Sequence, residues 1–231
     1  MEKTHILVVD DDPSILRLVC TNLRARGYNV SSAVDGEEAL EAVERDFVDL
    51  IILDLMMPKL DGVEVCRRIR EWSDVPIVVL SARGDEKGKV ECLELGADDY
   101  LTKPFGIAEL MARIKTAMRH SDTNRGGVAM PTTFTSGDLE INFAMRRVTV
   151  GGREIKLTPT EYSVLQQLAV NKDKVLTHSM LLQSVWGSEY SSEKEYLRVF
   201  IGRLRKKLEK GKKPGYIQTV PGVGYHLATA S

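Results

Sequence analysis

Residues 50–58 read LIILDLMMP, and this stretch decides the fold of the first half of the chain. Four consecutive apolar residues are typical of a strand that is covered on both faces, as in a parallel sheet. Similar apolar runs occur at 6–9 and 77–80. The pattern therefore predicts a parallel sheet in which Asp54 lies at the carboxyl end of a strand.

Weaker strand patterns at 28–32 and around 100–101 bring the number of predicted strands to five. Helix-length segments alternate with the strands, at 13–26, 36–45, 61–71, 86–95 and 107–119. Strands that alternate with helices in this way predict an α/β fold with a doubly wound parallel sheet. We expect this domain to span residues 1–121.

The second half has a different pattern. Residues 122–132 lack periodicity and contain many small and turn-forming residues, which predicts a linker. Beyond it, the sequence predicts an α+β domain over 133–231. It begins with a hairpin that turns at Gly151-Gly152. The capping box Thr158-Pro159-Thr160-Glu161 predicts the start of a helix, and helical patterns cover about 160–170, 178–186 and 193–209. A closing hairpin is predicted at 216–228.

The net charge of −1 conceals an asymmetry between the two halves. Residues 1–121 contain 16 Lys and Arg against 23 Asp and Glu, whereas residues 122–231 contain 16 against 10. An acidic half joined to a basic half is typical of a regulatory domain attached to a nucleic-acid binder. No apolar run is long enough to span a bilayer, no signal peptide is recognised, and the three cysteines form no CxxC motif, so we expect a cytoplasmic protein without a membrane partner.

Side chains with compatible chemistry follow four of the predicted strands. Asp10 and Asp11 end the first strand, Asp54 the third and Ser81 the fourth, and Lys103 follows the fifth. Ligands bind at this edge of an open α/β sheet. Crowded carboxylates repel one another unless a cation joins them, and hard oxygen ligands suit Mg²⁺. Taken singly, each Asp is more commonly a turn former or a helix cap, and capping is the favoured role of Asp12.

The predicted helix 193–209 has one apolar and one basic face. Its apolar residues recur with helical spacing at 197, 200, 201, 204 and 208. Basic residues project on the opposite side, with Arg203 and Lys207 nearer the flank. Such a helix suits DNA, although a solvated surface is the more common reading of the pattern alone.

The first 120 residues or so resemble a response-regulator receiver domain of the flavodoxin-like type. The matching motifs are Val8-Val9-Asp10-Asp11-Asp12, Asp54-Leu55-Met56-Met57-Pro58, Leu80-Ser81-Ala82-Arg83 and the stretch 96–105, which reads GADDYLTKPF. The resemblance implies that a histidine kinase phosphorylates Asp54. It further implies that Mg²⁺ is bound by Asp10, Asp11, Asp54 and the Met56 carbonyl. Ser81 and Lys103 would contact the phosphoryl group, and Tyr100 would turn inward on activation. The Lys103-Pro104 bond is expected to be cis.

The second half resembles the winged-helix effector domain of OmpR/PhoB-type regulators. The matching motifs are at 158–162, 174–177, 185–187 and 222–225. The resemblance implies binding to double-stranded promoter DNA and contact with RNA polymerase. The expected DNA contacts are Lys194, Arg198, Arg203, Arg205, Lys206 and Thr219, and Trp186 is expected in the core. Pro221 and Gly202 depart from the family pattern. The resemblance therefore does not say which residues contact the DNA bases. Some local features look most like the potassium-uptake regulators.

In regulators of this kind, phosphorylation leads to a homodimer through charge pairs. The resemblance implies that Lys89 pairs with Glu109, and Asp99 with Arg113, across the two subunits, and Asp98 with Arg119 more loosely. A solvated charged surface is the alternative.

Two other functions compete with this one. An aspartyl-phosphate phosphatase or ATPase would need a second carboxylate close behind Asp54, and Leu55-Met56 argues against it, so we expect no enzyme. A DNA-binding protein whose receiver only dimerises, without phosphorylation, is disfavoured by the complete set of acidic-site residues.

Overall fold

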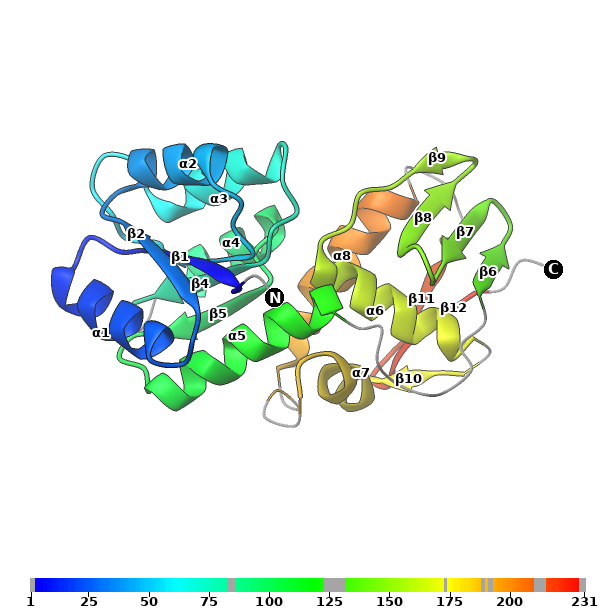
Figure 1. Ribbon diagram of the computed structural model, residues 1–231. Coiled ribbons are helices and arrows are strands. Elements are labelled where there is room, and N and C mark those ends of the chain that lie inside the picture. Colours follow the sequence, from blue (N-terminus) through cyan, green and yellow to red (C-terminus); the bar gives the residue numbers. More distant parts are fainter. Residues whose placement is uncertain are drawn as a thin grey trace. The chain divides into compact units, whose positions relative to one another are not determined.

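The structure is a computed structural model that describes residues 3–82, 86–122, 132–172, 174–187, 190, 193–209 and 215–228. The chain divides into two compact units, Met1–Ser121 and Asp122–Ser231. Each unit has its own sheet and helices (Figure 1). Nearly all of the predicted linker 122–132 lies outside the described residues, so its extent stays a prediction.

The first unit is built on a five-stranded parallel sheet, which confirms the predicted fold. Its strands are β1 (His5–Val9), β2 (Asn29–Ala33), β3 (Leu50–Asp54), β4 (Ile77–Ser81) and β5 (Asp99–Thr102). Its helices are α1 (Pro13–Arg24), α2 (Gly36–Arg45), α3 (Gly62–Arg70), α4 (Glu86–Leu95) and α5 (Ile107–Asp122). The strand order is β2-β1-β3-β4-β5, so the direction of winding reverses between β1 and β3.

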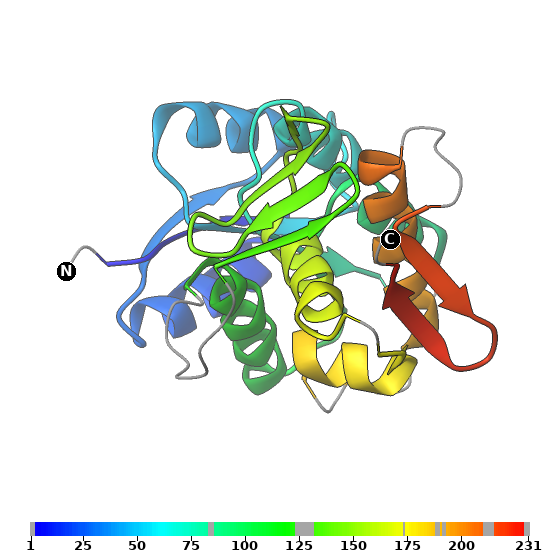
Figure 2. The ribbon, with the colours of Figure 1, turned by 90° about the vertical axis from the view of Figure 1, so that its right-hand side faces the viewer.

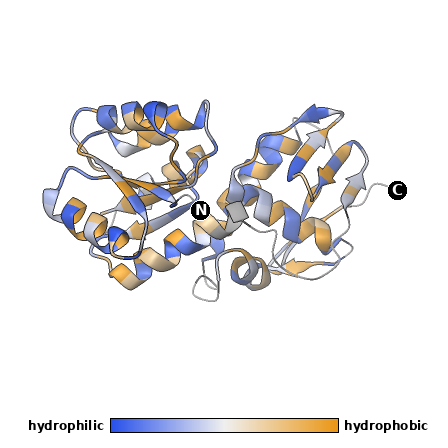
Figure 3. Cartoon of the chain, viewed as in Figure 1, coloured by the Kyte–Doolittle hydropathy of each residue, from blue (hydrophilic) through white to orange (hydrophobic). Residues whose placement is uncertain are grey.

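The central strands carry apolar residues on both faces because helices cover both faces (Figure 1). Every residue of β3 and β4 is buried. On one face α1 and α5 supply Leu23, Leu110 and Ile114 to a core cluster with the strands. The hydropathy colouring in Figure 3 shows apolar residues along the strands and mixed faces on the helices. This burial explains why the pattern at 50–53 predicted the sheet.

A buried ion pair joins the end of α3 to the start of β5. Arg70 Nη2 donates to Asp98 Oδ2 at 3.0 Å, and Arg70 Nε donates to the carbonyl of Gly96 at 3.0 Å. The Asp98 side chain is fully buried and also accepts from the N–H of Ile77 at 3.1 Å. Because a buried carboxylate is costly without partners, this pair fixes where β5 begins.

The second unit is the predicted α+β domain. Its four-stranded antiparallel sheet has the order β6-β7-β8-β9, and a three-stranded sheet has the order β10-β12-β11. The strands are β6 (Thr133–Ser136), β7 (Leu139–Asn142), β8 (Arg147–Val150), β9 (Arg153–Glu154), β10 (Leu176–Thr177), β11 (Ile217–Val220) and β12 (Gly224–Leu227). The helices are α6 (Pro159–Val170), α7 (His178–Val185) and α8 (Lys194–Leu208). Figure 2 shows the β11–β12 hairpin in red and α8 in orange.

Local sequence signals account for several features of this unit. Gly151 and Gly152 both have positive φ, 58° and 76°, in the turn between β8 and β9. Thr158 and Glu161 form the predicted capping box at the start of α6. The predicted strands did not include β6 and β7, whose four-residue segments carry only a short alternation.

The apolar face of α8 lies in the core of the second unit, as its periodicity predicted. Leu197, Phe200 and Leu204 are all fully buried. Trp186 packs against Phe200 with ring centroids 5.1 Å apart, which confirms the prediction that it belongs to the core. Among the described residues, no helix is both long and apolar enough to cross a membrane.

Replacing Arg70 with methionine should destabilise the first unit by about 3–5 kcal/mol, because Asp98 would keep a buried charge without its cation. Arg67→Met is the matched control on the same helix. Arg67 pairs with Glu64 on the surface at 2.7 Å, so its loss should cost about 1 kcal/mol or less. Urea unfolding followed by hydrogen exchange of peptides from β4 and β5 measures both effects. Equal losses for the two variants would contradict the assigned role of the buried pair.

Candidate functional site

Three carboxylates meet at the carboxyl ends of β1 and β3, the two strands between which the direction of winding reverses. The register pairs Val9 with Leu53, so the residues that follow, Asp10 and Asp54, lie next to each other at the carboxyl ends of β1 and β3. Oxygen atoms of Asp10, Asp11 and Asp54 all lie within 4.8 Å of one another. Asp10 and Asp54 are buried and Asp11 is exposed. The geometry therefore brings together the acidic residues that the sequence singled out.

Lys103 supplies positive charge to this site. Its Nζ lies 2.7 Å from Asp10 Oδ2 and 3.0 Å from Asp54 Oδ2. Burial works to lower the pKa of Lys103, but its hydrogen bonds to the two carboxylates outweigh burial and raise that pKa. The N–H of Lys103 donates to the carbonyl of Ser81 at 2.7 Å, and the Lys103-Pro104 bond is cis, as expected. One ammonium group thus serves two buried carboxylates.

Burial raises the pKa of Asp54, and the negative charge of Asp10 adds to the rise. Lys103 and the N–H of Met56 act in the opposite direction without cancelling it. The ionised carboxylate is therefore held at a free-energy cost in the folded protein. A second cation at Asp10, Asp11 and Asp54 would relieve that cost, and the all-oxygen donor set fits Mg²⁺.

Ser81 ends β4 beside these carboxylates. The register pairs Asp54 with Leu80 and Ser81 with Thr102, which places Ser81 at the same edge of the sheet. Its side-chain oxygen is buried and, within the described part of the chain, has no hydrogen-bond partner. A buried hydroxyl without a partner is costly and suits a site that binds a further group. Tyr100, on β5, is half-buried.

The loop between β3 and α3 is held by residues that the sequence analysis did not single out. A Cβ at Gly62 would lie 2.1 Å from the carbonyl oxygen of Asp54, so only glycine fits this close approach. Lys59 has a positive φ of 66°, and its Nζ lies 2.5 Å from Asp35 Oδ2. Asp35 also caps α2. An Asp-Gly pair such as Asp61-Gly62 is a turn signal that could have indicated Gly62, but no local pattern connects Lys59 with Asp35.

Asp12 has the role of a helix cap, as expected. Its carboxylate accepts a hydrogen bond from the N–H of Ser14 at 2.8 Å, at the start of α1. This bond lowers the pKa of Asp12.

The basic residues of α8 face in different directions. Lys194, Arg198 and Lys206 are exposed. Arg205 donates to Thr219 Oγ1 at 2.8 Å and to the carbonyl of Ile217 at 2.8 Å, so it connects α8 to the closing hairpin.

Arg203 lies deeper in the second unit than the other residues that were expected to contact DNA. It is only 8% exposed, and its Nε lies 2.8 Å from Glu161 Oε1 on α6. The sequence placed Arg203 on the flank of the helix, and the structure shows that Phe200 and Tyr196, one and two turns earlier on the same side, are buried with it. This burial counts against a contact of Arg203 with DNA, and that contact stays a prediction.

Four of the residues expected at a dimer interface have partners within the chain. Arg113 Nη1 lies 3.5 Å from Asp99 Oδ1, and Arg113 Nη2 lies 3.3 Å from Glu109 Oε1. Asp98 is buried against Arg70, which counts against its pairing with Arg119 across a dimer. The side chains of Lys89 and Arg119 lie outside the described residues.

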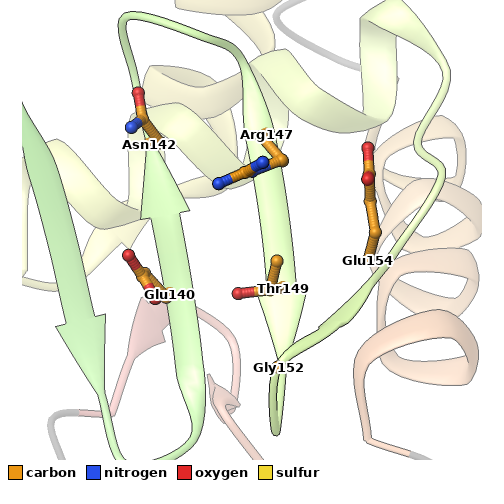
Figure 4. A pocket seen from close by; sticks show the side chains of 6 residues that line it. All are labelled: Glu140, Asn142, Arg147, Thr149, Gly152 and Glu154. Atoms are coloured by element: carbon orange, nitrogen blue, oxygen red, sulfur yellow. The ribbon is translucent and has the colours of Figure 1, made fainter.

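A separate hollow of about 260 Å³ lies on the four-stranded sheet of the second unit. Its lining is polar and comes from β7, β8 and β9 (Figure 4): Glu140, Asn142, Arg147, Thr149, Gly152 and Glu154. Its charged side chains are two glutamates and one arginine, and no group of three metal-ligating side chains was found on it among the described residues.

The fold and the acidic site define a class of regulatory protein, and comparisons with known proteins agree. Residues 6–115 match the response regulator receiver domain, and residues 152–227 match the transcriptional regulatory protein C-terminal domain. The chain belongs to the two-component response regulators of the OmpR/PhoB type, which are DNA-binding transcriptional regulators and not enzymes.

Individual relatives are similar over nearly the whole chain. Response regulator MprA of Mycolicibacterium vanbaalenii is 44% identical over 96% of this chain and 96% of its own length. Transcriptional regulatory protein KdpE of Mycobacterium tuberculosis is 42% identical over 97% and 99%. These nearly equal identities leave the potassium-uptake subgroup as a prediction.

Solved structures show the same two-domain chain. A RitR mutant has a TM-score of 0.77 at 28% identity and covers 98% of this chain and 100% of its own. DrrB of Thermotoga maritima, described as an OmpR/PhoB homologue, has a TM-score of 0.52 at 32% identity with the same coverage.

Replacing Asp54 with asparagine should stabilise the first unit in the absence of divalent metal. The raised pKa of Asp54 means that its ionised form destabilises the folded state at neutral pH, and asparagine removes this charge. We expect a rise in melting temperature on the order of 4 °C, which corresponds to about 1 kcal/mol.

Calorimetry in EDTA measures this rise. The difference between the two proteins should shrink as the pH falls through the raised pKa of Asp54, because the wild type then takes up the proton. Added Mg²⁺ should stabilise the wild type more than the variant. A wild type that melts above Asp54→Asn in EDTA would contradict the argument.

Proposed function

We propose that a histidine kinase phosphorylates Asp54 and that the phosphorylated protein dimerises and binds promoter DNA to control transcription. The observation that carries this proposal is the meeting of Asp10, Asp11 and Asp54 with Lys103 and an unpartnered Ser81 hydroxyl at one edge of the sheet. A carboxylate can accept a phosphoryl group as a nucleophile. The complete set supports phosphorylation over a receiver that serves only for dimerisation.

Each residue of the site has a part in this proposal. Asp10, Asp11, Asp54 and the Met56 carbonyl would hold Mg²⁺, which, when bound, neutralises phosphoryl charge. Lys103 already contacts Asp54 and would contact a phosphoryl oxygen as a point charge. The Ser81 hydroxyl would donate to another phosphoryl oxygen and so gain a partner.

The switch that follows would be a repacking at β4 and β5. When Ser81 turns toward the phosphoryl group, the half-buried Tyr100 would fill the space that it leaves. Tyr100 lies on β5, between α4 and α5, so this movement would reach the surface that carries Glu109 and Arg113.

The dimer would form through that surface. Arg113 pairs within the chain with Asp99 and Glu109, and the same kinds of pair would form between subunits once the repacking at β5 makes the buried Asp99 accessible. Lys89 would pair with Glu109 of the other subunit.

The DNA-facing set would consist of Lys194, Arg198, Arg205, Lys206 and Thr219. The exposed positions of Lys194, Arg198 and Lys206 support contacts to DNA, in which Lys and Arg neutralise phosphates. Arg205 and Thr219, bound to each other, would act where α8 meets the closing hairpin. RNA polymerase would be a further partner, and the cytoplasm the place of action.

Incubation with acetyl phosphate and Mg²⁺ tests the phosphoacceptor. We expect intact mass to show one added phosphoryl group on the wild type and none on Asp54→Asn. Asp61→Asn is the matched control, since Asp61 only caps α3 and asparagine caps equally well, so it should keep the mass gain. No mass gain on the wild type, or a gain on Asp54→Asn, would sink the assignment.

Reversing the charge of Arg113 tests the dimer surface. Arg113→Asp should weaken phosphorylation-dependent dimerisation by roughly tenfold, since it replaces attraction with repulsion at several pairs. Sedimentation of the phosphorylated protein measures this effect. Arg67→Asp, on the exposed face of α3, is the control and should leave the dimer intact. Unchanged sedimentation of Arg113→Asp would exclude this surface.

A further inference from the structure

The six basic side chains of α8 divide into groups according to what they contact. Lys194, Arg198 and Lys206 are exposed, and Arg205 is bound to the closing hairpin. Arg203 and Lys207 lie one turn apart and both reach toward α6. Two neighbouring lysines, Lys206 and Lys207, thus have opposite environments.

A single buried carboxylate holds the two side chains that face α6. Glu161 is fully buried. Its Oε1 lies 2.8 Å from Arg203 Nε, and its Oε2 lies 2.6 Å from Lys207 Nζ. The N–H of Thr158 donates to Oε2 at 2.8 Å, so the capping box of α6 fixes the carboxylate itself. One negative charge therefore restrains two positive ones.

The restraint differs in strength between the two cations. Arg203 is buried, with its guanidinium carbon 4.8 Å from the centroid of the Phe200 ring. The Lys207 side chain is 34% exposed, so it would be free to reach a phosphate if Glu161 did not hold it. Charge-assisted hydrogen bonds to a buried acceptor are the strong kind, which favours the held position.

We propose that Glu161 is a positioning and specificity-determining residue for DNA binding: it withholds Lys207 from DNA phosphates and, through the buried Arg203, fixes the rotation of α8. The inference rests on the proposed DNA-facing set of α8. Binding to any DNA sequence strengthens with each phosphate that a cation neutralises. By withholding Lys207, Glu161 lowers the affinity for all sequences alike, and by fixing α8 it preserves contacts that distinguish one sequence from another.

The two neighbouring lysines provide a matched test. The affinity of the full-length protein for a short mixed-sequence duplex is measured by fluorescence anisotropy over a series of KCl concentrations. Lys206→Met should reduce the slope of log affinity against log salt by about 0.9, the value for one phosphate contact. Lys207→Met should leave the slope unchanged.

The outcomes separate the inference from the function on which it rests. A slope that falls by about 0.9 in Lys207→Met would show that Lys207 already contacts a phosphate, and would overturn the inference alone. A slope that changes in neither variant would refute the DNA-facing set, and the inference would fall with it.

Removing the charge of Glu161 gives the second test. Glu161→Gln keeps an acceptor for the capping box but releases Lys207, so the slope should steepen by about 0.9. Glu161→Gln combined with Lys207→Met should restore the wild-type slope, which a loss of folding could not do. For specificity, a duplex is first selected from a random library by its binding to the wild type. The ratio of the affinity for this duplex to the affinity for the mixed-sequence duplex should fall several-fold in Glu161→Gln. A variant with unchanged circular dichroism, slope and preference would overturn the inference.

Discussion

The contact of Lys103 with Asp10 and Asp54 is the interaction on which the first unit depends. Parallel strands bring their carboxyl ends to one edge, so the fold itself forces these carboxylates together. A single ammonium group makes the cluster tolerable but leaves it short of positive charge, and Asp54 keeps a raised pKa. In the function we propose, this deficit would favour the binding of a metal ion at a site that is not already neutral. The negative charge of the carboxylates is therefore only partly balanced by Lys103.

The sequence was sufficient for those features that follow from a short repeating pattern. The buried strands, the capping box at Thr158 and the apolar stripe of α8 all depend on neighbours within one or two turns or pleats. The acidic edge could also be predicted, since strand ends converge in any parallel sheet. The pairs Lys59–Asp35 and Arg70–Asp98 could not, because their partners lie 24 and 28 residues apart and each residue alone resembles an ordinary surface charge.

Arg203 shows why the basic helix was harder to read than the acidic edge. Periodicity places a residue on a helix at an angle, but it does not say where the neighbouring helix supplies a carboxylate. Glu161 was already accounted for as a cap, and nothing in its local sequence indicated that the same carboxylate also accepts from α8. A residue that satisfies a local rule can therefore have a second, distant role that the rule conceals.

The two units treat buried carboxylates in opposite ways. In the first, Asp10 and Asp54 share one ammonium group, so the trio carries net negative charge and its pairing can change when another cation arrives. In the second, Glu161 alone accepts from both Arg203 and Lys207, so that trio carries net positive charge and has no further need of a cation. Since a buried ion pair by itself is weak evidence for either stability or function, the ratio of charges is the more informative quantity. In the functions we propose, the excess of buried acid lies where the protein would be switched, and the excess of base around a single acid lies where its geometry would be fixed.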